Sequence, residues 1–155
     1  MLTKEDPSRP GPGATGDYAG SCGDGGDGVY PPWDGMIVSF NAKIPNSTNI
    51  NWRVHAISFR DVKDGLSNTI LAGEKHIRAG KLLEHWADSS IYNGDYWENY
   101  MVAGGLNWPM AKSPEDSTQR MVFGSWHPGI CQVVMGDGSV LALSVSIELE
   151  TLRRL

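Results

Sequence analysis

The clearest alternation of apolar and polar positions lies near the end of the chain. Two runs rich in β-forming residues, 130–135 and 139–145, flank the tripeptide Gly136-Asp137-Gly138. An Asp-Gly pair accepts positive φ angles and is a frequent turn between paired strands. The pattern therefore predicts an antiparallel β-hairpin over residues 130–145.

Earlier segments carry weaker strand patterns. Residues 36–40 form a short apolar run, residues 52–59 alternate in polarity, and residues 68–73 predict a strand that continues into Glu74. Residues 82–105 spread aromatic side chains through polar sequence, so helix and strand both stay open there.

The last ten residues predict a short amphipathic helix. Val145, Leu149 and Leu152 are spaced at i, i+4 and i+7, which places them on one helical face. Acidic residues come first and arginines last, as the helix dipole favours.

Glycine and proline dominate the start of the chain. The first 35 residues hold nine of the 19 glycines and five of the nine prolines, which predicts loops with little regular structure. We expect residues 1–13 to be flexible and residues 14–155 to form a single domain, since 155 residues fit one domain. The expected fold class is α+β, with an antiparallel sheet, long glycine-rich loops and a short C-terminal helix.

Charge argues against a nucleic-acid partner. The formal net charge is −5, and residues 1–35 carry two basic and six acidic residues, a formal −4. A surface that follows phosphates has the opposite sign. No run reaches the roughly 18 apolar residues of a membrane span, and no apolar signal segment follows Met1, so we expect a processed or partial chain without an anchor.

Two cysteines, Cys22 and Cys131, are too few for a four-cysteine zinc site. A disulfide between them would close a loop of about 110 residues and contribute about 4–5 kcal/mol in the chain-entropy model. Two buried free thiols are the alternative, and the residues alone leave both open.

Two sequence blocks together resemble a known family. His127-Pro-Gly-Ile-Cys-Gln-Val-Val-Met-Gly-Asp137-Gly138 places nine residues between a histidine and Asp-Gly. The segment from Asp61 to Glu74 resembles a second block of the same family, "I-T-D-G-T-S-N-T-I-x-x-G-E". This "H-X9-DG" signature is typical of bacterial prepilin-like proteins filed as domain of unknown function 1559, and the resemblance covers roughly residues 14–155.

The resemblance implies a pseudopilin-like globular domain without the family's N-terminal prepilin helix. It also implies secretion and an extracellular, cell-surface or periplasmic location, where oxidation is available and the disulfide is favoured. It implies no enzymatic activity.

The signature residues are interpreted as structural: His127, Asp137, Gly138, Asp64, Gly65, Asn68 and Glu74. We expect His127 to fix the entry to the hairpin by bonding one of the carboxylates in the two blocks, so that His127→Ala costs about 1–3 kcal/mol. The four histidines have no paired spacing, so no transition metal is expected. Weak Ca²⁺ binding stays open for loop carboxylates around Asp61 and around Asp24.

No catalytic residues are expected, because no nucleophile-elbow pattern surrounds Ser125 and His127 lies too far from Cys131 along an extended chain. Exposed aromatic side chains can bind sugars or a partner, and the candidates are Trp86, Tyr96, Trp97 and Trp108.

The leading hypothesis is a non-enzymatic, extracytoplasmic, pseudopilin-like structural or assembly module whose partners are other pilin-like subunits or itself. The alternative is a binding module for carbohydrate or another exported ligand, which would use residues 86–108. No cofactor is expected under either hypothesis.

Overall fold

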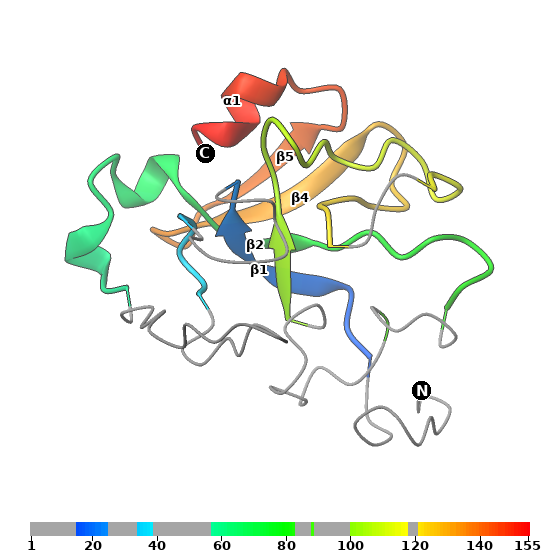
Figure 1. Cartoon of the computed structure of the whole chain (residues 1–155), viewed down its shortest axis with the longest axis horizontal. Helices are drawn as coiled ribbons and strands as arrows, with labels where there is room; N and C mark the ends of the chain where they lie inside the picture. Colours follow the sequence, from blue (N-terminus) through cyan, green and yellow to red (C-terminus); the bar gives the residue numbers. More distant parts are fainter. Residues whose placement is uncertain (1–14, 25–33, 39–56, 83–87, 89–99, 118–120) are drawn as a thin grey trace, which may run out of the picture.

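A computed structural model describes residues 15–24, 34–38, 57–82, 88, 100–117 and 121–155 (Figure 1). These residues form five strands, two short 3-10 helices and one α-helix. In chain order the elements are β1 (Tyr18–Gly23), η1 (Phe59–Asp61), η2 (Leu66–Asn68), β2 (Ile70–Glu74), β3 (Met101–Ala103), β4 (Ile130–Met135), β5 (Val140–Ser144) and α1 (Leu149–Arg153).

The strands make one sheet in the order β3-β1-β2-β4-β5, which with α1 confirms the α+β class. The pairs β1–β2, β2–β4 and β4–β5 are antiparallel, whereas β1 and β3 are parallel. The sheet is therefore mixed, and the prediction of a purely antiparallel sheet is wrong at β3. Parallel strands need a long crossover connection. The chain makes a long connection between β2 and β3, after which β3 pairs with the edge of β1 that faces away from β2.

The predicted hairpin is confirmed as β4 and β5, and no helix interrupts residues 130–145. Its turn is closed by the Gly138 N–H, which donates to the Met135 carbonyl at 2.9 Å. Gly138 has φ +86°, a conformation that side-chain-bearing residues rarely adopt. The Asp137 carboxylate accepts the Ser139 N–H at 2.8 Å, so both residues of the Asp-Gly pair serve the turn.

Strand β1 lies in the segment that composition predicted as loop, so that prediction is wrong for residues 18–23. Small side chains are needed here because other chain segments approach the strand closely. A Cβ on Gly20 would lie 2.5 Å from the Ile37 side chain, which covers this position. Glycine therefore serves close packing in the sheet.

Two other predicted strands are not found where the structure describes them. Residues 59–61 form the 3-10 helix η1, which a capping box between Ser58 and Asp61 begins. Residues 36–38 have no regular structure, although the Ile37 N–H donates to the Ser21 carbonyl at 2.9 Å. Parts of these predictions lie outside the described residues, namely residues 1–13, 25–33, 39–40 and 52–56.

The main hydrophobic core joins one face of the sheet to α1. Phe123, Val133 and Met135 are buried in it together with Leu152 of α1. Leu143 of β5 and Val145 pack against the same cluster, so the predicted C-terminal helix is confirmed in a shorter form. In Figure 1, α1 lies beside β5 at the red end of the chain. None of the helices in the described ranges is long and apolar enough to cross a membrane.

Acid should loosen α1. Hydrogen bonds from Arg153 and Arg154 lower the pKa of Glu150 from 4.5 to about 2. A carboxylate with a depressed folded-state pKa stabilises the fold above its unfolded pKa and loses that contribution as the pH falls through the folded value. We expect the amide NMR shifts of Thr151 and Leu152 to change between about pH 5 and pH 2. Glu150→Gln should abolish this transition, and a transition that persists in the variant would contradict the assignment.

Candidate functional site

The two signature blocks lie against each other because β2 and β4 are antiparallel neighbours. Gly73 pairs with Val133, and Ile70 pairs with Met135. The two blocks therefore run side by side in opposite directions along β2 and β4. Sequence separation alone could not show this arrangement.

At one end, Glu74 joins the two strands through its side chain. Its Oε2 accepts the backbone N–H of Gln132 at 2.7 Å, and its Oε1 lies 3.3 Å from Nε2 of His127. Among the carboxylates expected as partners of His127, Glu74 is the one that the histidine meets. Glu74 is itself buried, so these contacts compensate the loss of water around its carboxylate.

At the other end, the backbone of the hairpin turn bonds the chain around η2. The Gly136 N–H donates to the Thr69 carbonyl at 2.8 Å, and the Asp137 N–H donates to the Leu66 carbonyl at 3.2 Å. The Asn68 amide in turn donates to the Asp64 carbonyl at 2.9 Å. The signature residues thus connect β2 and β4 at both ends.

The Glu74–His127 contact stands at a cavity of about 320 Å³. Its lining consists of Asp17, Glu74, Lys75, Ile77, Leu82, Gly124, Ser125, Trp126 and His127. Lys75 is buried, and desolvation lowers the pKa of its ammonium group while the charges of Asp88 and Asp17 act in the opposite direction. The Trp126 indole N–H donates to the Ile77 carbonyl at 2.9 Å, which fixes the ring at the cavity wall.

His127 is more exposed than the sequence interpretation required. Its side chain is 57% exposed, and its Nε2 contacts the Glu74 carboxylate. The backbone N–H of His127 donates to Oγ of Ser125 at 3.0 Å, which helps to order the corner before β4. The expected cost of about 1–3 kcal/mol stays a prediction, and the exposure of the imidazole favours a value at or below the lower end of that range.

Replacing His127 with alanine should lower the free energy of unfolding by less than about 1 kcal/mol, because the imidazole is largely exposed to water and Glu74 keeps its hydrogen bond from the Gln132 N–H. Urea denaturation of the wild type and the variant measures this difference. A loss above about 2 kcal/mol would show that the imidazole has a structural role beyond the Glu74 contact.

The disulfide expected from the resemblance is absent, since Cys22 and Cys131 are both free and buried. They lie on β1 and β4, and β2 runs between these strands, which places the strands roughly 10 Å apart. A disulfide needs Cα atoms within about 7 Å. Burial raises the pKa of each thiol to about 12, so neither is a thiolate at neutral pH.

The expected aromatic platform is only partly described. Trp86, Tyr96 and Trp97 lie outside the described residues. Trp108 packs against a second core cluster that contains Cys22 and Met101, and its buried indole N–H has no hydrogen-bond partner among the residues that the structure describes. Trp108 is therefore a packing residue rather than an exposed platform.

The carboxylates considered for Ca²⁺ have protein partners. The Asp61 carboxylate accepts the backbone N–H of Ser58 at 2.9 Å. Asp24 accepts the backbone N–H groups of Leu106 and Asn107 at 3.0 and 3.2 Å, which closes a loop. Within the described ranges, no three His, Cys, Asp or Glu side chains stand close enough together to hold a metal ion.

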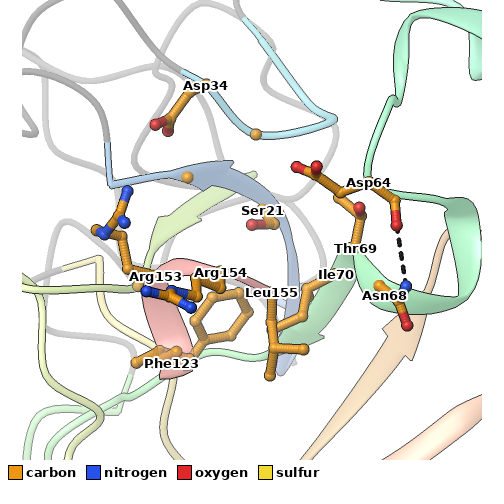
Figure 2. A pocket seen from close by; sticks show the side chains of 14 residues that line it. Ser21, Asp34, Asp64, Asn68, Thr69, Ile70, Phe123, Arg153, Arg154 and Leu155 are labelled. Atoms are coloured by element: carbon orange, nitrogen blue, oxygen red, sulfur yellow. Dashed lines mark hydrogen bonds between the residues drawn. The ribbon is translucent and has the colours of Figure 1, made fainter. Parts of the chain in front are cut away.

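A larger cavity of about 530 Å³ lies between α1 and the start of β2. In Figure 2, Arg153 and Arg154 approach it from α1, while Asp64 and Asn68 stand on the other side and Asp34 above. Both arginines bond Glu150, and the Ile70 N–H donates to the carbonyl of Leu155. The charged groups from α1 are thus already committed to contacts within the chain.

Strand β5 forms one edge of the sheet. The bonds Met135 N–H to Ser139 carbonyl and Val145 N–H to Gly129 carbonyl lie at the two ends of the β4–β5 ladder. In an antiparallel ladder, residue pairs that are hydrogen-bonded to each other alternate with pairs that are not. Val140 and Ala142 belong to the pairs that are not bonded, so their backbone N–H and C=O groups point away from β4. These outward groups have no partner among the described residues.

Comparison with known families supports the signature. Residues 3–150 match the model of a family described as "Protein of unknown function (DUF1559)". No curated protein and no solved structure matches the chain. Because the match spans nearly the whole sequence and includes both blocks that meet across β2 and β4, the chain belongs to the DUF1559 family.

Proposed function

We propose that the chain is a non-enzymatic, extracytoplasmic assembly module of a pseudopilin-like kind, which associates through the free edge of its sheet at β5. The observation that carries the proposal is the row of outward backbone groups on Val140 and Ala142. Such groups form hydrogen bonds with an added strand, as in other cases of sheet extension.

The side chains of β5 favour association. Val140 is 62% exposed and Leu141 is also exposed. Natural edge strands are commonly protected by lysine, proline or a bulge, and β5 contains no charged residue and no proline. Docking would bury these apolar side chains and satisfy the outward backbone groups together.

A second copy of this chain is the partner that we propose. The chain carries a formal charge of −5, so two copies repel each other over much of their surfaces. The hairpin carries only Asp137 as a charged residue, and β5 itself is neutral. Two β5 strands can therefore pair without placing like charges opposite each other.

The local chemistry supports a non-enzymatic role. Ser125 Oγ accepts the backbone N–H of His127, and the Cys131 thiol has a pKa of about 12. Neither residue is therefore activated as a nucleophile. The extracytoplasmic location rests on the resemblance of the two signature blocks to exported prepilin-like proteins.

Ala142→Pro tests the proposed edge. The Ala142 N–H points away from β4, so proline removes an outward donor and no bond of the β4–β5 ladder. Sedimentation equilibrium of the wild-type chain should show concentration-dependent dimers, and the variant should bind itself about tenfold more weakly.

Ala142→Val is the matched control, because valine keeps the backbone donor and suits a strand. Circular dichroism checks that both variants are folded. A wild-type chain that stays monomeric up to about 1 mM, or an Ala142→Pro variant that dimerises as the wild type does, would overturn the proposal.

A further inference from the structure

The cavity beside Glu74 and His127 combines a negative wall with an apolar one. Asp17, Glu74 and Lys75 contribute a formal −1 to its lining when His127 is neutral. The charges of Asp88 and Asp17 both favour the ammonium of Lys75, so two nearby carboxylates compensate this one positive charge. The carboxylates of Asp17 and Glu74 therefore leave the cavity electrostatically suited to a cation.

The apolar wall consists of Ile77, Leu82 and Trp126. The indole of Trp126 is held by its bond to the Ile77 carbonyl, yet the residue remains 51% exposed. An indole that is held at its N–H and half exposed can receive an organic cation through a cation–π contact. Leu82 is also exposed and extends the apolar surface.

We propose that this cavity binds a small organic ammonium ion, with the charged nitrogen near Glu74 and Asp17 and the apolar body against Trp126 and Leu82. A volume of about 320 Å³ lies at the lower end of the range of small-molecule sites, so the ligand is small. A free amine and a lysine side chain of a partner share this chemistry. The site is separate from the β5 edge, and the proposal does not depend on association of the chain.

Titrations followed by ¹H–¹⁵N NMR test the proposal with three probes of similar shape and different charge. Benzylammonium should shift the indole N–H signal of Trp126 and the amide signals of Ser125 and His127. Neutral benzyl alcohol should bind at least about threefold more weakly, and benzoate more weakly still, because the lining is negative. Tighter binding of Nα-acetyl-lysine amide than of benzylammonium would indicate that the cavity prefers a lysine side chain. The reverse order would indicate that it prefers a free amine.

Glu74→Gln and Asp17→Asn should each weaken benzylammonium binding about threefold, while the dispersion of the spectrum reports that the variants are folded. The glutamine of Glu74→Gln keeps a side-chain oxygen that can still accept the Gln132 N–H. Trp126→Leu should weaken binding by a similar factor, because it removes the cation–π contact. Glu150→Gln is the matched control, since this carboxylate lies on α1 outside the cavity lining.

Binding of benzylammonium that is unaffected by Glu74→Gln and Asp17→Asn would overturn the proposal. Benzoate binding as tight as benzylammonium binding would do the same, as would shifts confined to signals outside the cavity. The supporting result is a saturable shift at Trp126 whose apparent affinity falls in the charge variants and is unchanged in Glu150→Gln.

Discussion

Replacing Phe123 with alanine should lower the free energy of unfolding by about 3–5 kcal/mol, the usual cost of removing a fully buried aromatic ring. Phe123 is 1% exposed and belongs to the main core with Val133 and Leu152. Its ring fills the space that Gly73 and Gly104 leave open, since a Cβ on either glycine would come within 3.0 Å of it. Little of the surrounding backbone can collapse into the resulting cavity.

Phe59→Ala is the matched control for this variant. Phe59 lies on η1 and is 64% exposed, so the same change in chemistry should alter stability by less than about 0.5 kcal/mol. Urea or guanidinium denaturation of both variants gives the comparison. Equal losses at the two positions would show that Phe123 does not fill the core in the way described.

The second large effect is expected at Gly73, where substitution by valine should cost about 3 kcal/mol. A Cβ at this position would lie 2.8 Å from Cε1 of Phe123 and 2.9 Å from Cγ1 of Val133. Both atoms belong to buried side chains that are packed on all sides, so relief requires the sheet and the core to move apart. Valine's strand preference offsets only part of this cost.

A double variant shows whether the clash with Phe123 is the cause. Phe123→Leu shortens the side chain that Gly73 faces, so Gly73→Val with Phe123→Leu should cost less than the sum of the two single changes, by about 1 kcal/mol. Ala142→Val adds comparable bulk to the exposed strand β5 and should be nearly neutral. Strict additivity of the Gly73 and Phe123 changes would contradict direct packing between them.

These expectations give a physical meaning to the glycine and the glutamate that end the first signature block. Gly73 admits the Phe123 ring on one face of β2, and Glu74 bonds the backbone of β4 and approaches His127. Adjacent residues thus serve the core and the small cavity separately. Variation at Glu74 should therefore change binding in the cavity with a smaller effect on stability than variation at Gly73.

The elements whose cause is local could be predicted from the amino-acid sequence. The β4–β5 hairpin followed from two β-rich runs around Asp137-Gly138. The spacing of Leu149 and Leu152 indicated the C-terminal helix, although Val145 lies in a turn before it. The two motif blocks also identified the family, because each is a short continuous segment that can be recognised without knowing how the chain folds. Such signals depend on turn geometry and periodicity, which neighbouring residues specify.

Contacts between segments that are distant in the sequence could not be predicted in this way. The glycines of β1 resembled a loop, because sequence composition does not show that Ile37 will cover Gly20. The parallel pairing of β3, the separation of Cys22 from Cys131 and the meeting of Glu74 with His127 all depend on strand order in the sheet. Strand order is set by burial of one shared core rather than by local preference, and local patterns therefore do not contain it.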